Sequence, residues 1–256
     1  MKLYQQTENC SDFDISLDGD SSPSFRVLLP EHIEGAGLET RFVHTHPGTW
    51  ATDGQQTSGR LELEGRVRVD IEIHCTENLA AITMSLSNLT NETMTNLSAN
   101  ICTAVNHLPS ESPPDWSNRR FIPDEIPLDR FEQGDYWFEQ HTPNRLFALT
   151  GTDWVHMHPN PAEPVGMDRP RFAFNPSEQA NAQACAVESL DGSEWFYQAW
   201  NRPCYYCTPC CGNGCMHLVV CIADSLEPGE SVTLKGWIGS NTGNQNDLSK
   251  HINGLD

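Results

Sequence analysis

The sequence predicts an all-β protein: a single antiparallel β-sandwich with long ordered loops over one mouth. Three observations lead to this fold class. Apolar and polar residues alternate along several stretches, Gly and Pro turns separate those stretches, and helical periodicity is weak throughout. Without an alternation of strands and helices, a parallel sheet is not expected. We expect one domain over residues 1–256, with residues 109–176 as a loop-rich insertion and residues 201–217 as a Cys-rich loop.

Period-two alternation identifies the expected strands in chain order. Residues 66–74 place four β-branched residues on one face and charged residues on the other. Residues 82–86 and 97–105 repeat this pattern, and an Asn-rich turn separates them. Asp191-Gly192 then predicts a hairpin into an aromatic strand at 194–200. Pro228-Gly229 precedes a closing strand at 232–238.

A single helix is expected, at residues 175–184. Asn175 is a suitable N-cap, and Pro176 occupies the first helical position, where proline is favoured. Residues 88, 91 and 96 each begin an Asn-x-Ser/Thr pattern, which we interpret as chance matches in a turn-rich stretch.

The charge balance excludes several classes of partner. The chain has 15 Lys+Arg and 35 Asp+Glu, a formal net charge of −20. Nucleic acids and anionic membranes attract basic surfaces, so neither partner is expected. No signal peptide, membrane-spanning run or Gly-rich phosphate loop is visible. We therefore expect a cytoplasmic protein that uses no nucleotide cofactor.

Histidines form the first group of candidate functional residues. The segment His44-Thr45-His46-Pro47 precedes Trp50, and on an extended chain both imidazoles would face the same side. A second His-x-His-Pro step occurs at residues 156–159. His107 ends an apolar strand face, which places it at a mouth of the sandwich. The candidate acid/base residues are His44, His46, His107 and His217, of which His44, His46 and His217 are also candidate ligands of an open metal site.

Cysteines are concentrated in the segment from residue 204 to residue 217, where five of them precede a histidine. The Cys-x2-Cys spacing lets two thiolates bind one ion from a tight turn. We expect a structural zinc or another thiophilic metal, with disulfides and free thiols as alternatives. The candidate ligands are Cys204, Cys207, Cys211 and Cys215.

The loop-rich insertion combines carboxylates, arginines and aromatic residues. Planar side chains stack on sugar rings, and charged groups bind hydroxyls, so this mixture suits a groove for a polar ligand. The candidate substrate-binding residues are Trp50, Trp116 and Arg120.

Three segments resemble a group of bacterial β-sandwich proteins of planctomycete type. They are His44–Pro47 with Trp50, residues 88–121, and Cys215-Met216-His217 ahead of Pro228-Gly229-Glu230. That group is similar in architecture to the galactose-mutarotase-like supersandwich. The resemblance implies a concave sheet face that binds sugars, with histidines and acids transferring protons.

Three functions follow from these observations. The first is a carbohydrate-directed protein, an epimerase or a lyase, that uses histidine acid/base groups on a small polar ligand. The second is an enzyme or binding protein that depends on zinc or another divalent transition metal. The third is a non-enzymatic acidic protein that assembles with itself, as a homo-oligomer, or with other proteins.

Overall fold

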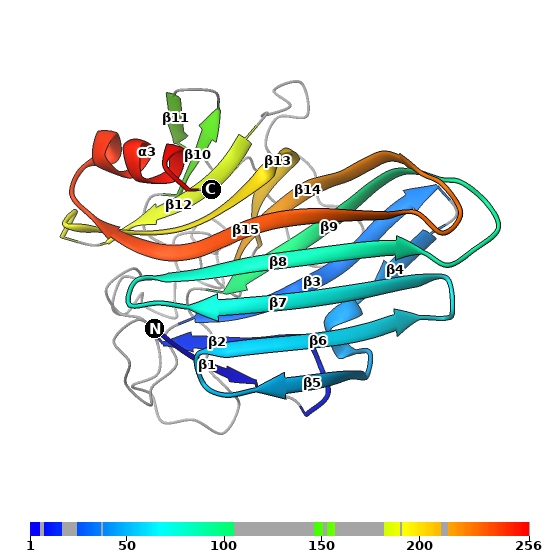
Figure 1. The fold of residues 1–256 in the computed structure, drawn as a ribbon. Coiled ribbons are helices and arrows are strands. Elements are labelled where there is room, and N and C mark those ends of the chain that lie inside the picture. Colours follow the sequence, from blue (N-terminus) through cyan, green and yellow to red (C-terminus); the bar gives the residue numbers. More distant parts are fainter. Residues whose placement is uncertain are drawn as a thin grey trace, which may run out of the picture.

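Antiparallel strands make up most of the fold in the computed structural model (Figure 1), which describes residues 1–5, 8–16, 25–36, 38–104, 146–150, 153–156, 182–189, 191–210 and 215–255. The strands are β1 (Lys2–Gln5), β2 (Asp12–Ser16), β3 (Phe25–Ala36), β4 (Leu38–Arg41), β5 (Gly48–Thr52), β6 (Gln56–Leu63), β7 (Val67–Cys75), β8 (Leu79–Asn88), β9 (Met94–Ala104), β10 (Leu146–Thr150), β11 (Asp153–His156), β12 (Ala182–Glu188), β13 (Glu194–Cys210), β14 (Cys215–Leu226) and β15 (Ser231–Thr242). A 3-10 turn, η1 (Val43–Thr45), and a helix, α3 (Gln245–Asn253), complete the described elements. The predicted all-β antiparallel fold is confirmed.

One long sheet folds back on itself to form the two layers of the sandwich. Its strand order is β1-β2-β3-β9-β14-β13-β15-β8-β7-β6-β5, with β4 on β3 and a small β10–β12 extension on β13. The layer of β5–β8 lies in front of β2, β3 and β9 in Figure 1. The two ends of the sheet approach each other, since the Leu3 amide donates to the Gly54 carbonyl at 3.1 Å. The sheet is therefore nearly closed around its core.

The alternation that predicted the strands also produces the core. On β7, Val67, Val69, Ile71 and Ile73 are buried against residues of β8, β9 and β14 in one large apolar cluster. Full burial of each such side chain contributes about 1.5–3 kcal/mol. The side chains of β2, β3, β9 and β14 that do not enter this cluster lie on the opposite face of their layer, which is where the candidate site is found.

A second, smaller apolar cluster joins α3 to β13, and it includes Trp195, Tyr197 and Leu248. Asn244 caps α3 by accepting from the Asp247 amide, and Asp247 in turn accepts from the Asn244 amide. The helix expected at 175–184 is wrong in its last three residues, because residues 182–184 begin β12 and pair with β13. Its first seven residues lie outside the described chain.

The predicted Cys-rich loop at 201–217 is largely a continuation of strands. Residues up to Cys210 extend β13, and β14 begins at Cys215. The two strands pair from Cys204↔Val220 to Cys210↔Cys215, with a register shift between Cys204 and Tyr206. The Tyr and Thr residues of this segment favour extended backbone, and β13 continues through the first cysteines.

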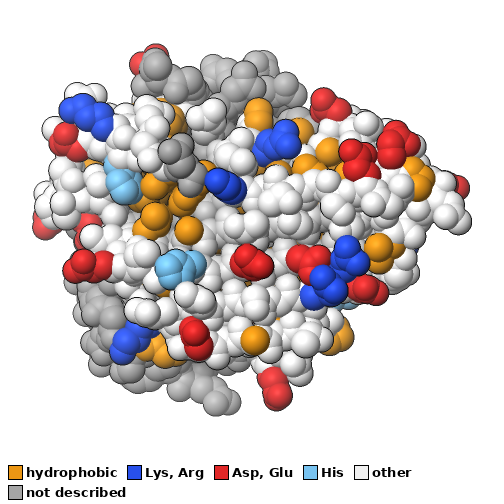
Figure 2. Space-filling model, in the orientation of Figure 1, with side chains coloured by type: hydrophobic (Ala, Val, Ile, Leu, Met, Phe, Trp, Pro, Cys, Tyr) orange, Lys and Arg blue, Asp and Glu red, His pale blue; other side chains and the backbone are white. Residues whose placement is uncertain are grey.

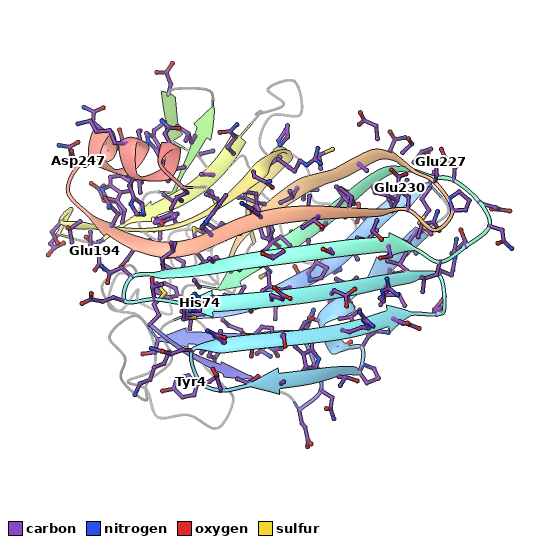
Figure 3. All side chains as sticks on the ribbon, in the orientation of Figure 1. Tyr4, His74, Glu194, Glu227, Glu230 and Asp247 are labelled. Carbon is purple, nitrogen blue, oxygen red and sulfur yellow. The ribbon has the colours of Figure 1, made fainter. Side chains whose placement is uncertain are left out.

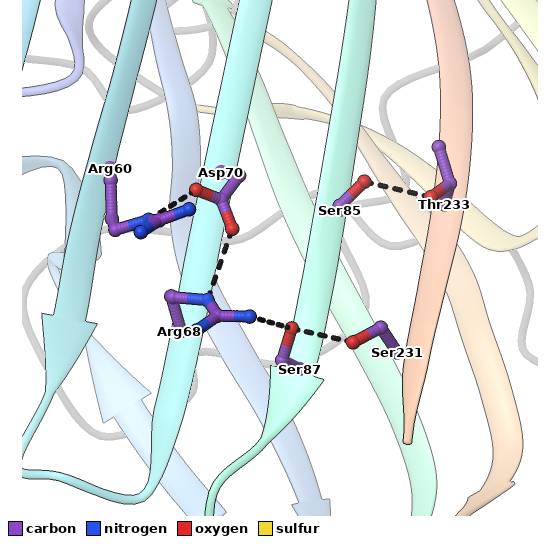
Figure 4. Close-up of polar contacts among 7 residues, drawn as sticks. All are labelled: Arg60, Arg68, Asp70, Ser85, Ser87, Ser231 and Thr233. Carbon is purple, nitrogen blue, oxygen red and sulfur yellow. Dashed lines mark hydrogen bonds and ion pairs between the residues drawn. The ribbon is translucent and has the colours of Figure 1, made fainter. Parts of the chain in front are cut away.

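The outer face of the β6–β8 and β15 layer is polar. Figure 2 shows positive and negative side chains interspersed there among uncharged ones. Asp70 accepts from Arg60 at 2.5 Å and from Arg68 at 3.2 Å, and Ser87 pairs with Ser231 at 2.7 Å (Figure 4). The Arg60–Asp70 and Ser87–Ser231 contacts join neighbouring strands, and such cross-strand pairs stabilise the sheet.

Acidic side chains lie at both ends of this layer. Glu227 and Glu230 lie at the β14–β15 hairpin, whereas Glu194 at the start of β13 and Asp247 within α3 lie at the other end (Figure 3). No helix in the described part of the chain combines the length and the apolar character needed to cross a bilayer.

Candidate functional site

A row of side chains crosses four neighbouring strands on the polar face of the β2-β3-β9-β14 layer. Asp12 pairs with Leu28, Leu28 with Cys102, and Cys102 with His217. Directly opposed residues in antiparallel strands have Cβ atoms about 4.5–5.5 Å apart. The sheet therefore places the Cys102 thiol next to the His217 imidazole, and the backbone ladder fixes their positions.

Glu31 enters this row from an irregular stretch of β3. The register of β3 against β9 shifts between Leu28 and His32, and Glu31 lies in that interval. A register shift of this kind turns a side chain away from its regular direction. The result is a contact of 3.1 Å between Glu31 Oε2 and His217 Nε2. One ligand atom each of Glu31, Cys102 and His217 lies within 4.8 Å of the others.

Two further imidazoles lie near the Glu31 carboxylate. His32 Nε2 is 3.8 Å from Glu31 Oε1, and His32 Nδ1 accepts from the Phe42 amide at 3.0 Å, so a neutral His32 carries its proton on Nε2. His44 is buried, and its Nδ1 has no hydrogen-bond partner within the described residues.

The charges of this group shift the pKa values of its members. Burial alone would raise the pKa of Glu31, but the interactions with His217, His32 and His44 outweigh burial and lower it. Burial lowers the pKa of His44 despite the attraction of Asp12 and Glu31. Glu31 is thus held as a carboxylate, and His44 as a neutral imidazole.

A second group of charges lies one row along the same face. Arg26 donates to both carboxylate oxygens of Asp12 and sits opposite Asp14 on the neighbouring strand. Asp14 is fully buried, and neither of its oxygens has a hydrogen-bond partner among the described residues. Burial, followed by repulsion from Asp12, raises the pKa of Asp14 to about 7.

Of the four predicted acid/base histidines, His44 and His217 both lie close enough to Glu31 to lower the pKa of its carboxyl. His46 does not join them. The prediction that an extended segment places the His44 and His46 imidazoles on the same side is wrong. Residues 43–45 form the η1 turn, which buries His44 and leaves His46 half-buried beyond the end of the turn. His107 lies outside the described residues, as do Trp116, Arg120 and Cys211.

Trp50 contacts the apolar core. Its ring meets Phe13 edge-on, with centroids 5.3 Å apart, and it covers Gly59 on the neighbouring strand. The Trp50 ring thus packs β5 against β2 and β6. Sugar binding was the role predicted for Trp50, and this packing role was not predicted.

Cys204 is buried near Cys185 and Cys221. Burial, followed by electrostatic interaction with these two cysteines, raises the pKa of the Cys204 thiol. A thiol in such surroundings is a poor metal ligand until it loses its proton. Cys207 and Cys215 lie within β13 and β14, but their side chains are outside the described part, so the structural metal site stays a prediction.

Several residues of the site were not among the predicted ones, including Glu31, Cys102 and Phe42. Cys102 carried a signal, because alternation places it opposite the core residues Ala99 and Ile101. Glu31 carried none, since a register shift cannot be read from the sequence. Phe42 has an unusual φ of 55° and is 55 % exposed, and its ring lies 5.2 Å from His32 and 6.2 Å from His44.

No protein-family model and no curated protein matches this sequence. Similar solved structures do exist. The Slr1438 protein from Synechocystis sp. PCC 6803 is 10 % identical with a TM-score of 0.51, and the match covers 95 % of this chain and 96 % of that protein. At this identity the similarity concerns the fold alone, and it agrees with the predicted sandwich.

Galactose mutarotase-like and aldose 1-epimerase proteins are also among the structural neighbours. An aldose 1-epimerase candidate from Escherichia coli K12 is 12 % identical with a TM-score of 0.49, covering 94 % of this chain and 99 % of that one. A galactose mutarotase-like protein from Lactobacillus casei ATCC 334 is 10 % identical with a TM-score of 0.48 and the same coverage. Nothing in these similarities supports the planctomycete-type group named above.

Proposed function

We propose that this chain binds a small carbohydrate on the polar face of β2, β3, β9 and β14 and transfers protons to and from it through Glu31 and His217. The observation that carries the proposal is their contact of 3.1 Å. A carboxylate and an imidazole within hydrogen-bonding distance are a suitable pair for general acid and base catalysis.

The surroundings of the pair supply what a sugar ligand needs. Asp12, Arg26 and His32 offer donors and acceptors for hydroxyl groups along the same face. Phe42 adds an exposed aromatic surface next to the imidazoles. Pockets that combine one apolar surface with a few placed polar groups are typical of small-ligand sites.

Strained backbone beside the pair supports a binding role for Phe42. A left-handed φ is unfavourable for an aromatic residue and persists only where the surroundings hold it. Here the Phe42 amide donates to His32, and the Phe42 carbonyl accepts from the Thr45 amide at 3.0 Å and from the Thr45 hydroxyl at 2.8 Å. These bonds keep the ring in place beside the site.

The proposed reaction is the interconversion of the two anomers of an aldose. One group of the pair removes the proton of the anomeric hydroxyl while the other protonates the ring oxygen. The bond between the anomeric carbon and the ring oxygen breaks, and the open-chain aldehyde forms. Rotation about the adjacent carbon–carbon bond and reversal of both proton transfers close the ring as the other anomer. No net proton or electron is exchanged.

The test is a polarimetric assay of anomer interconversion with a panel of hexoses and pentoses. We expect the wild-type protein to exceed the buffer rate, and E31Q and H217Q to lower kcat by about 10²–10⁴-fold. H74Q, which changes an exposed histidine on the opposite layer, is the matched control and should retain full activity. We expect F42A to raise KM more than it lowers kcat.

Two outcomes would overturn the proposal. One is a wild-type protein that neither binds nor turns over any sugar of the panel, and the other is a pair of variants as active as H74Q.

A further inference from the structure

We infer that Glu31, Cys102 and His217 form a binding site for a thiophilic divalent metal ion, of which Zn²⁺ is the best-fitting example. The three residues come from the adjacent strands β3, β9 and β14. Their carboxylate oxygen, sulfur and imidazole nitrogen all lie within 4.8 Å of one another. Among the His, Cys, Asp and Glu side chains of the described residues, these three have potential ligand atoms close enough together to hold one ion.

The spacing of these atoms suits a tetrahedral ion. Zn–N and Zn–O bonds of about 2.0–2.1 Å and a Zn–S bond of about 2.3 Å place neighbouring ligand atoms about 3.3–3.6 Å apart. Glu31 Oε2 and His217 Nε2 are 3.1 Å apart, close to that spacing. Small side-chain rotations bring Cys102 to the same distance, because its backbone is already paired with that of His217.

The donor set determines the class of metal. Mg²⁺ and Ca²⁺ prefer sites made only of oxygen ligands, whereas a thiolate combined with an imidazole selects softer transition ions. Three protein ligands leave one of the four zinc positions open. Structural zinc sites fill all four positions, so this site belongs to the open kind.

Polar and charged side chains surround the three candidate ligands. His32 lies 3.8 Å from the other oxygen of Glu31 and can orient that carboxylate. Arg26 lies close enough to Cys102 for the two side chains to interact electrostatically. Because Asp12 binds Arg26 through both carboxylate oxygens, the local charge still attracts a cation.

A bound ion would affect the proposed reaction. It would occupy the Glu31 oxygen and the His217 nitrogen that proton transfer requires. We therefore expect metal-loaded protein to be inactive towards sugars and metal-free protein to be active. This consequence rests on the proposed function, whereas the binding of the metal does not.

The test uses the metal alone, without a sugar. Protein freed of metal with a chelator is titrated with Zn²⁺ in competition with a chromophoric chelator, and with Co²⁺ to detect the thiolate-to-cobalt absorption band. A C207S/C211S background removes two of the four other candidate cysteine ligands and so disrupts that group. We expect one equivalent to bind in that background, with C102S weakening it by on the order of 100-fold or more and abolishing the cobalt band.

Two further variants keep the test decisive. H217Q should weaken binding as C102S does, and it replaces C102S if that variant fails to fold. C221S, which changes a half-buried cysteine of β14, should bind as the background does. Absence of a bound ion in the background, or binding unchanged by both C102S and H217Q, would overturn the inference. If the protein binds zinc but its metal-free form turns over no sugar, that result would instead reject the proposed function and leave this site standing.

Discussion

Glu31 of β3 and His217 of β14 meet across β9, with the carboxylate oxygen Oε2 3.1 Å from the imidazole nitrogen Nε2. Neither side chain lies on a long loop, because both belong to strands of one continuous antiparallel sheet. Groups held on strands keep their geometry better than groups held on loops. The pair is therefore in position before any ligand arrives.

The Glu31–His217 contact is expected to appear as an energetic coupling. Both side chains are largely buried, so removal of one partner leaves the other without compensation. We expect E31Q and H217Q each to lower the free energy of unfolding by about 1–3 kcal/mol. The double variant should lose about 1 kcal/mol less than the two losses added together. Urea unfolding of the four proteins at neutral pH measures this, and additive losses would contradict the contact.

The sequence predicted the fold better than the site, and the reason is physical. Alternation reports which face of a strand is buried, so it identified the sandwich and placed Cys102 away from the core. His44 was found through its motif, although the η1 turn, rather than an extended strand, positions it. Glu31 depends on a register shift between β3 and β9, which involves residues far apart in the chain. The residues next to Glu31 in the sequence therefore do not indicate this register shift.

Asp14 is expected to make stability fall as the pH rises from about 4 to 7. The pKa of this buried carboxyl is raised to about 7, mainly by burial, so the folded state favours its protonated form. Its contribution is complete below the unfolded pKa, near 3.8, and is lost as the pH passes through the folded pKa. The three-unit difference sets an upper limit of about 4 kcal/mol.

The D14N variant isolates this effect, because asparagine does not titrate. We expect the stability of the wild type relative to D14N to decline between pH 4 and pH 7 in urea unfolding. D224N, which alters an exposed aspartate on β14, should follow the wild-type pH dependence. A constant difference between wild type and D14N across this range would show that Asp14 does not titrate there.

Asn88 is expected to be essential for the hairpin ends that meet around it. Its side chain is fully buried, and its amide donates to the carbonyls of Glu92 at 2.8 Å and Leu226 at 2.9 Å. Its side-chain oxygen accepts from the Thr90 amide at 2.9 Å. The Asn-x-Thr pattern at this position therefore serves the fold, as an amide engaged in this way is not exposed for modification.

N88A should lower the free energy of unfolding by about 1–3 kcal/mol, because it removes the donor that satisfies the buried Leu226 carbonyl. N91A, at an exposed position in the same turn, should change stability by less than about 0.5 kcal/mol. Thermal unfolding followed by circular dichroism compares the two variants. Equal effects at both positions would contradict the role assigned to Asn88.

Gly59 is expected to be required because the Trp50 ring lies directly on it. A Cβ at residue 59 would overlap the Trp50 ring, and the two residues face each other across the β5–β6 pairing. G59A must displace the ring from Phe13, at a cost of about 1–3 kcal/mol, whereas S58A on the same strand should be close to neutral. In a W50A background the obstacle is absent, so G59A should then cost little. Urea unfolding of the single and double variants measures this difference. If G59A lowered the free energy of unfolding equally in both backgrounds, a contact other than that with Trp50 would require glycine at residue 59.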